Sequence, residues 1–357
     1  MLEARAAVRT LKEYHPPLGG RVGLRLDFNE NTVGCSPRVL ERLRQLQFDQ
    51  LARYPERESV EHQVAAHLRV DPCGLLLTNG VDEAIHLVCE TYLEPGDEVL
   101  IVVPTFSMYE IYAAATGAKV ITIPAGPAFR YPTDEVLARI SPRTRLIAIA
   151  NPNNPTGAVV AKADLLRILR AAPDAALLVD EAYFDFYGES LLPEVVNFAN
   201  LFVARTFSKA YGLAGLRIGV LAGSAAQMAM VRRVGSPYNV NAVALACLPD
   251  ALADQEYVRR YVAEVRQGRE RLEQELRSLK LHFWPSQANF VLVQIGERHD
   301  AFVRAMRERG ILVRDRSRDP GCDGCVRISV GAKSQTERLI VALREVVRAM
   351  APTGVPA

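Results

Sequence analysis

The chain has 357 residues, of which 49% are hydrophobic and 24% charged, so it suits two domains in one compact unit better than a single simple core. Its formal net charge of +2 excludes a general attraction to nucleic acid or to a membrane surface, so any site for anions must be local. The amino terminus has no long apolar stretch and the six cysteines are mostly scattered, which indicates a soluble protein of the cytoplasm.

The first part of the chain predicts an arm, a short strand and a helix. Residues 1–23 are basic and rich in proline and glycine near residues 14–21, which is typical of an extended arm. Residues 24–29 alternate in polarity like a short strand. Ser36 and Pro37 predict the N-cap and first residue of a helix. Its expected apolar face consists of Leu40, Leu43 and Leu46.

Between residues 75 and 221 the pattern alternates between strand and helix. Helical stretches, for example at residues 82–92 and 162–171, separate many of the apolar runs. This alternation predicts a mostly parallel sheet covered by helices on both faces, with functional sites at the carboxyl ends of the strands. The predicted strands lie at residues 75–77, 99–103, 120–123, 146–149, 177–179, 201–204 and 218–221.

After residue 238 the pattern changes to that of a smaller α+β unit. A long amphipathic helix is predicted at residues 255–279, followed by short strands at 290–293, 311–314 and 326–329 and helices at 299–309 and 333–350. We therefore expect three segments. Residues 1–46 form the arm and part of a small domain, residues 47–240 form a large domain, and residues 241–357 complete the small domain.

Three predicted strands end in polar residues that can carry chemistry. Lys209 follows the run 201–204, and a lysine at the end of a core strand is costly unless its ammonium is paired or used. Positive charge on Arg217 and on Arg205 is expected to lower the pKa of Lys209 and free its amine as a nucleophile. The sequence N-N-P-T-G follows the run 146–149, and D-E-A-Y follows the run 177–179. Taken singly, these motifs also fit a surface lysine, a plain turn and a helix N-cap.

The chain resembles the fold type I pyridoxal-phosphate (PLP) aminotransferases. The resemblance is carried by three motifs in this order: N-N-P-T-G, D-E-A-Y, and S-K with its arginine. Within these aminotransferases, the sequence is most similar to the histidinol-phosphate aminotransferases. The resemblance runs from N-E-N at residues 29–31 to R-I-S-V-G at residues 327–331. It implies the PLP-dependent transferase fold, in which helices sandwich a mostly parallel seven-stranded sheet and a smaller α+β domain is attached. The large domain of residues 47–240 is then the PLP-binding domain.

The resemblance also implies catalytic roles. Lys209 forms the Schiff base with PLP and moves the proton, while Asp180 keeps the pyridine nitrogen protonated. Tyr183 and Asn154 bond the phenolic oxygen of the cofactor. Tyr109 matches the aromatic residue that stacks on the ring, with Phe106 as a near competitor.

Binding residues follow from the same resemblance. The cofactor phosphate is expected at Ser208, Arg217 and the start of a helix at Gly80, Val81 and Asp82, where free N–H groups and the helix dipole favour an anion. Tyr54 is expected to reach the phosphate in the neighbouring subunit of a homodimer. The substrate is expected at Asn154, at Tyr14 in the arm and at Arg327, which would bind its distal anion. Arg314 also resembles the family's pattern.

The function expected from this resemblance is transamination of histidinol phosphate with 2-oxoglutarate, in histidine biosynthesis. Other amine or amino-acid donors, including aromatic ones, and a decarboxylase similar to the threonine-phosphate enzyme remain alternatives. A PLP-binding regulator is disfavoured because no DNA-binding segment is visible. No metal is expected, because Cys322 and Cys325 lack a second pair of ligands. The sequence leaves open the amino donor, the choice between transamination and decarboxylation, and the roles of the arm and of the two cysteines.

Overall fold

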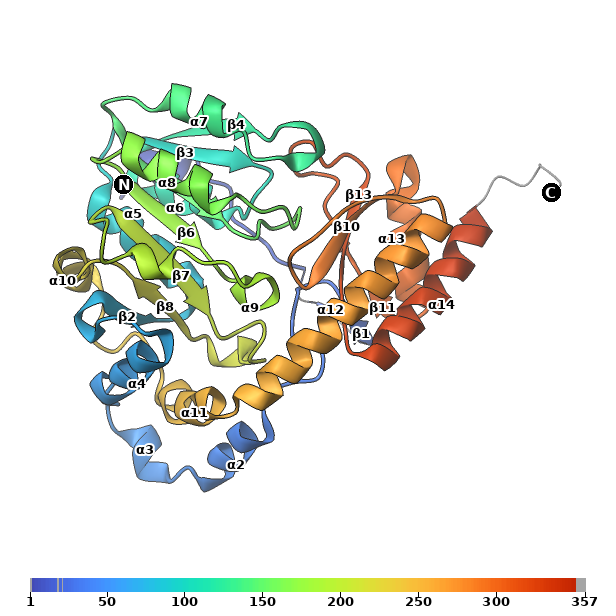
Figure 1. Cartoon of the computed structure of the whole chain (residues 1–357), viewed down its shortest axis with the longest axis horizontal. Coiled ribbons are helices and arrows are strands. Elements are labelled where there is room, and N and C mark those ends of the chain that lie inside the picture. The colour runs from blue at the N-terminus through green and yellow to red at the C-terminus, as the bar shows by residue number, and fades with distance from the viewer. Residues whose placement is uncertain (1, 18, 21, 351–357) are drawn as a thin grey trace.

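The computed structural model describes residues 2–17, 19–20 and 22–350. Figure 1 shows a larger body around one sheet and a smaller one around a second sheet, with the long helix α12 (Gln255–Ser278) running between them. The division at residues 46 and 240 stays a prediction.

The larger body is built on a seven-stranded sheet in the order β2-β8-β7-β6-β5-β3-β4. The neighbours from β7 to β4 are parallel, and β8 is antiparallel to both β7 and β2. The mostly parallel sheet predicted from the sequence is confirmed. Its strands are β2 (Leu75–Thr78), β3 (Glu98–Val103), β4 (Lys119–Pro124), β5 (Thr144–Ala150), β6 (Ala176–Asp180), β7 (Leu201–Thr206) and β8 (Gly219–Ala222).

Helices cover both faces of this sheet (Figure 1). Strand β6 shows why its residues are apolar throughout: Leu178 packs in one cluster with Ile85, while Leu177 and Val179 pack in another with Ile168. Because successive side chains of a strand point to opposite faces, a strand covered on both sides has no polar alternation. The helices of this body are α5 (Gly80–Tyr92), α6 (Met108–Thr116), α7 (Thr133–Arg139), α8 (Lys162–Ala171), α9 (Phe184–Tyr187) and α10 (Ala225–Val234).

The amino-terminal segment contributes to both bodies. Its elements are α1 (Ala6–Arg9), β1 (Leu24–Arg25), α2 (Pro37–Gln45), α3 (Phe48–Ala52) and α4 (Glu58–Leu68). The strand is shorter than expected and pairs in parallel with β11 (Ile311–Leu312), so it belongs to the smaller body. Ser36 caps α2 as predicted. The expected apolar face of α2 is partly wrong, because Leu40 is 48% exposed and the buried residue is Val39. In the predicted arm, Leu18 and Arg21 lie outside the described residues.

The smaller body holds an antiparallel sheet in the order β12-β13-β10-β9. Its strands are β9 (His282–Trp284), β10 (Phe290–Gln294), β12 (Arg314–Asp315) and β13 (Cys325–Ser329). Helices α13 (His299–Glu308) and α14 (Lys333–Met350) belong to this body: α14 packs against α12 and α13, and α13 packs against β12 and β13. Helix α11 (Ala242–Ala253) packs instead against α2 and α4, next to the larger body (Figure 1). The single strand predicted at residues 311–314 is wrong, because β11 and β12 belong to different sheets. Cys322 and Cys325 are buried in a small apolar cluster with Leu292.

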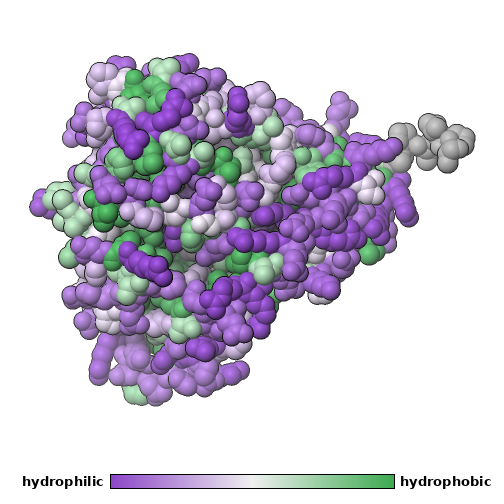
Figure 2. Space-filling model, in the orientation of Figure 1, coloured by the Kyte–Doolittle hydropathy of each residue, from purple (hydrophilic) through white to green (hydrophobic). Residues whose placement is uncertain are grey.

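Short 3-10 helices connect several of these elements, at Pro72–Gly74, Pro127–Phe129, Leu192–Glu194, Ala214–Leu216 and Gly296–Arg298. On the face drawn in Figure 2, hydrophilic side chains cover most of α12 and its neighbours, and hydrophobic ones form scattered patches. Among the described residues, no helix is both long and apolar enough to cross a membrane.

Candidate active site

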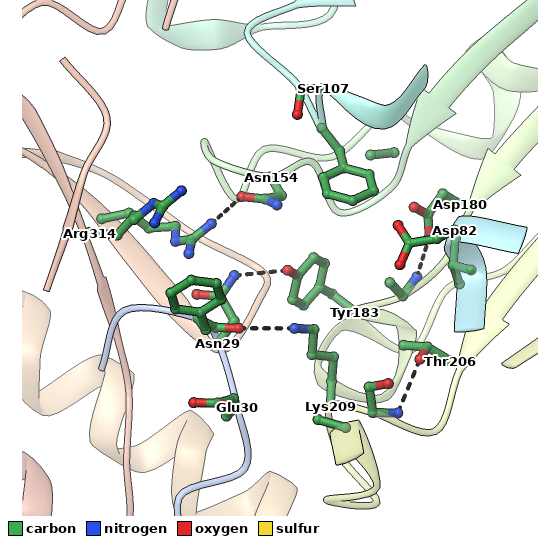
Figure 3. A pocket seen from close by; sticks show the side chains of 18 of the residues that line it. Asn29, Glu30, Asp82, Ser107, Asn154, Asp180, Tyr183, Thr206, Lys209 and Arg314 are labelled. Atoms are coloured by element: carbon green, nitrogen blue, oxygen red, sulfur yellow. Dashed lines mark hydrogen bonds between the residues drawn. The ribbon is translucent and has the colours of Figure 1, made fainter. Parts of the chain in front are cut away.

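A pocket lies where the carboxyl ends of three parallel strands face the smaller body. Ala150, Asp180 and Thr206, the last residues of β5, β6 and β7, all line it. The opposite wall comes from the segment after β1 and from β12 and β13 of the smaller sheet. Figure 3 shows Asp82 and Asp180 on one side, Asn154 and Arg314 on the other, and Tyr183 and Lys209 between them. The pocket thus joins residues that are far apart in the sequence.

Lys209 projects into this pocket from the segment that follows β7. Its Nζ donates a hydrogen bond of 3.0 Å to the backbone oxygen of Phe28. Burial, followed by the charge of Arg327, lowers the pKa of Lys209 to about 8, and Arg217 acts in the same direction. Arg205 was also expected to lower this pKa, but its guanidinium lies 2.9 Å from the buried carboxylate of Glu181, which neutralises its charge.

Asp180 is a buried carboxylate at the end of β6. Its Oδ1 accepts a hydrogen bond of 2.9 Å from the backbone N–H of Ala182, and its Oδ2 accepts one of 2.6 Å from the hydroxyl of Tyr109. Burial raises the pKa of Asp180 to about 6, so the group is largely ionised at neutral pH. A negative charge in this position can hold a protonated aromatic nitrogen.

The prediction that Tyr109 stacks on the cofactor needs correction. Tyr109 is only 1% exposed and is absent from the pocket wall in the described part of the chain, whereas Phe106 lines the pocket. The reason is local geometry: Tyr109 lies in the first turn of α6, on the face that packs against the sheet, and Phe106 precedes the helix. The two rings pack edge to face, with their centroids 5.8 Å apart.

Tyr183 lines the pocket beside Lys209. Its hydroxyl accepts a hydrogen bond of 2.8 Å from the side-chain amide of Asn29, and burial raises its pKa. Sequence reasoning named Asn29 only as the start of the resemblance and missed it as a site residue. The buried position of Asn29 is fixed by Ser329, whose hydroxyl donates to its side-chain oxygen at 2.9 Å. The sequence carries no signal for this role, because the burial of Asn29 and its partners Tyr183 and Ser329 are apparent only in the folded chain.

One end of the pocket is built to hold an anion. Helix α5 begins at Gly80 without a side-chain cap, so the first N–H groups of the helix, at Val81 and Asp82, are open toward the pocket. Gly80 has φ of +73°, and a Cβ there would lie 2.6 Å from Arg217. Arg217 is held 2.8 Å from Asp82. The buried hydroxyl of Ser208 has no partner among the described residues. This cradle fits a phosphate group, as the PLP-binding prediction requires.

The other end of the pocket is also cationic. Arg327 is buried, and its guanidinium donates to Asn154 Oδ1 at 2.5 Å and to the backbone oxygen of Asp27 at 2.6 Å. Burial, followed by the charge of Arg316, lowers the pKa of Arg327 to about 9. Arg314 lies alongside and donates to the hydroxyl of Tyr14 at 3.4 Å. The residues expected to bind substrate, Tyr14, Asn154 and Arg327, are therefore brought together.

Tyr54 lies on the surface, away from this pocket. Its side chain is 78% exposed and stacks on Tyr238, with ring centroids 4.3 Å apart. A role in its own pocket is excluded by this position. The predicted role in a neighbouring subunit stays a prediction.

Comparisons with known proteins agree with this site. The family model for aminotransferase class I and II matches residues 21–345. A histidinol-phosphate aminotransferase of Moorella thermoacetica is 35% identical over 97% of this chain and 93% of its own length. One from a Geobacillus species is 36% identical over 91% of this chain and 90% of its own. The solved structure of histidinol-phosphate aminotransferase from Sinorhizobium meliloti, in complex with pyridoxal-5′-phosphate, matches with a TM-score of 0.89 at 25% identity, covering 98% of this chain and 99% of that one.

These matches span nearly the whole chain, and the pocket supplies a buried lysine, a buried carboxylate and a phosphate cradle. The chain therefore belongs to the class I and II aminotransferases and is a PLP-dependent aminotransferase.

Proposed function

We propose that the protein transfers the amino group of histidinol phosphate to 2-oxoglutarate, giving imidazole acetol phosphate and glutamate. One observation carries this proposal: arginines line the pocket at two places, Arg217 near the start of α5 and Arg314 with Arg327 on the smaller sheet. The charges of Arg217 and Arg327 both act on Lys209. The end at Ser208 and Arg217 takes the phosphate of the cofactor. The end at Arg314 and Arg327 is then free to take a second anion, and histidinol phosphate carries its phosphate at the end opposite its imidazole ring. The names of the similar curated proteins support the same substrate.

Each residue of the pocket would have its own role in this reaction. When bound, PLP supplies an aldehyde that takes up amino groups and a ring that accepts electrons. We propose that Lys209 holds the cofactor covalently and then moves a proton at the reacting carbon of the substrate, a role suited to an amine with a pKa of about 8. Asp180 would hold the ring nitrogen protonated. The hydroxyl of Tyr183 and the amide of Asn154 would face the phenolic oxygen of the cofactor, and Phe106 would cover the ring.

The same cationic end would serve both half-reactions. Histidinol phosphate has no carboxylate, so its phosphate must be the anion that Arg327 binds. The second substrate, 2-oxoglutarate, offers a carboxylate at its far end, which a guanidinium also binds with paired hydrogen bonds. A single arginine at the pocket floor thus accommodates both substrates in turn.

We further propose that the working form is a cytoplasmic homodimer. The exposed position of Tyr54, together with its stacking on Tyr238, leaves its hydroxyl available to a second subunit. In this arrangement Tyr54 would complete the phosphate cradle of the partner.

The proposal is tested by steady-state turnover of the PLP-loaded protein with 2-oxoglutarate and a panel of donors: histidinol phosphate, phenylalanine, tyrosine and phosphothreonine. Glutamate formation should be fastest, by kcat/KM, with histidinol phosphate. Faster turnover of an aromatic amino acid would show that the proposed substrate is wrong, although the reaction would still be a transamination. Release of carbon dioxide from phosphothreonine without glutamate formation would indicate a decarboxylase instead.

A further inference from the structure

A third arginine stands in the substrate end of the pocket. Strand β12 pairs with β13 so that Arg314 lies opposite Arg327, and the pairing continues beyond β12, where the N–H of Arg316 donates to the backbone oxygen of Cys325 at 2.9 Å. Residues two apart on an extended segment point to the same face, and directly opposed residues of neighbouring strands share a face. Arg314, Arg316 and Arg327 therefore project from one side of the sheet, and all three line the pocket.

Each of these guanidinium groups keeps one buried N–H without a hydrogen-bond partner among the described residues. The three donors are Arg314 Nη1, Arg316 Nε and Arg327 Nε. Arg327 is itself only 5% exposed. Buried donors without partners are costly, so their presence in a pocket indicates a ligand that supplies several acceptor atoms. A phosphate group has three free oxygens for this purpose, whereas a carboxylate has two.

The charges in this cluster favour the same ligand. The three arginines carry three positive charges, and Asp319, which forms an ion pair with Arg316, carries one negative charge. The balance of the four groups is +2. A phosphate monoester at neutral pH carries close to two negative charges, while a carboxylate carries one. Removal of Arg316 would leave Asp319 without its ion-pair partner, and the net charge of the group would fall to +1.

We propose that Arg316, positioned by Asp319, is a specificity-determining residue that favours an amino donor with a phosphate monoester at its far end over the same donor without the phosphate. This inference rests on the proposed function and names the feature that sets its substrate class. Asp319 is suited to positioning because it closes a turn on Arg316: its N–H donates to the backbone oxygen of Arg316 at 2.9 Å. The side chain of Arg316 is 14% exposed, so it is held in the wall and does not extend into solvent.

A purely structural ion pair is the competing explanation. In that case the Arg316–Asp319 pair would only stabilise the turn at residues 316–319, and its loss would affect all donors alike. A role in specificity would instead change the ratio of kcat/KM for a donor with a phosphate to kcat/KM for the same donor without one. Histidinol phosphate and histidinol provide that pair, because they share the amine and the imidazole ring.

The experiment compares Arg316→Ala, Arg316→Lys and Arg318→Ala in the PLP-loaded protein. Arg318 is exposed on the same turn and is the matched control. For Arg316→Ala, the ratio of kcat/KM for histidinol phosphate to that for histidinol should fall about tenfold or more, since charge-assisted hydrogen bonds to the phosphate are lost. Arg316→Lys should recover part of the ratio, and Arg318→Ala should stay within about twofold of the unaltered protein.

An unchanged ratio in Arg316→Ala, or an equal loss with both donors, would overturn the inference. A second measurement separates this failure from failure of the proposed function. Titration calorimetry of inorganic phosphate into the PLP-loaded protein should show binding that weakens about tenfold in Arg316→Ala and is unaffected in Arg318→Ala. If the unaltered protein does not use histidinol phosphate, the proposed substrate is wrong, and the phosphate titration still decides the role of Arg316. Equal phosphate affinity in both variants would then refute it.

Discussion

Lys209 sits in a place where its positive charge is disfavoured. Burial, with Arg327 and Arg217 nearby, gives it a pKa of about 8 in the folded chain, below the ordinary value of 10.5. Below about pH 8 the amine is protonated in both the folded and unfolded chain, and the folded chain bears the full cost of the buried charge. Between pH 8 and 10.5 the folded chain has released the proton and the unfolded chain has not, so this cost decreases as the pH rises.

Replacing Lys209 with Met should therefore stabilise the PLP-free protein while abolishing transamination. At pH 7 the free energy of unfolding should rise by about 1–3 kcal/mol, and the gain should shrink from pH 8 upward and vanish near pH 10.5. Chemical unfolding at several pH values measures this. Lys119→Met, at an exposed position of β4, is the control and should show no such pH dependence. A loss of stability in Lys209→Met at pH 7 would contradict the argument.

At this scale the sequence motifs located most of the site. Lys209, Asp180, Tyr183 and Asn154 were each predicted from a strand end, and the parallel sheet brings such ends to one edge. The choice of Tyr109 over Phe106 failed because two aromatic residues three positions apart cannot be ranked without knowing where α6 begins. Asn29 was missed because its partners, Tyr183 and Ser329, are distant in the chain.

Two helices are coupled through their caps. Ser36 accepts a hydrogen bond from the N–H of Arg38 at the start of α2, and Asp254 accepts one from the N–H of Tyr257 at the start of α12. The hydroxyl of Ser36 also donates to Asp254 at 2.5 Å. One serine thus ties the amino-terminal segment to the helix that connects the two bodies.

Ser36→Ala should lower the free energy of unfolding by about 1–2 kcal/mol, because both the cap and the link to Asp254 are lost. Ser224 caps α10 with a single longer hydrogen bond of 3.4 Å, so Ser224→Ala is a matched control and should cost less than Ser36→Ala. Urea unfolding of both variants at pH 7 makes the comparison. Equal costs would show that the link between the two caps contributes nothing.

Elements were predicted well where local pattern and packing agree. The bounds of α8 and α14 matched the predicted residues, and the strands of the large sheet matched within a few residues. The failures lie at β1, β11 and β12, which are two residues long and are defined by pairing with distant segments. Leu40 was predicted on a buried face of α2 because periodicity shows which residues share a face but does not say what covers it.

On the scale of the whole molecule, apolar side chains are exposed together on and next to α3. Phe48 is 85% exposed and Leu51 is 59% exposed, close in sequence to the exposed Tyr54. Exposed apolar patches of this kind mark interaction surfaces, and a second copy of the chain is the partner expected here.

Light scattering should therefore report a dimer for the unaltered protein. Phe48→Asp combined with Leu51→Asp should shift it toward monomer and lower kcat/KM more than tenfold, since a buried charge opposes association and Tyr54 would no longer reach its partner. Val341→Asp, at an exposed position of α14, is the control and should remain dimeric. A stable monomer with full activity in the unaltered protein would rule the dimer out.

The central claim is that a single pocket, formed from distant parts of the chain, converts an amine with the help of Lys209 and PLP. The most direct test mixes the PLP-loaded protein with histidinol phosphate alone, without 2-oxoglutarate, and follows the visible absorbance of the cofactor. The absorbance of the lysine-bound cofactor should disappear as that of pyridoxamine phosphate forms, and 2-oxoglutarate should restore it. Lys209→Ala should show neither the starting band nor the change. An unchanged spectrum in the unaltered protein, or an unaltered response in Lys209→Ala, would contradict the account.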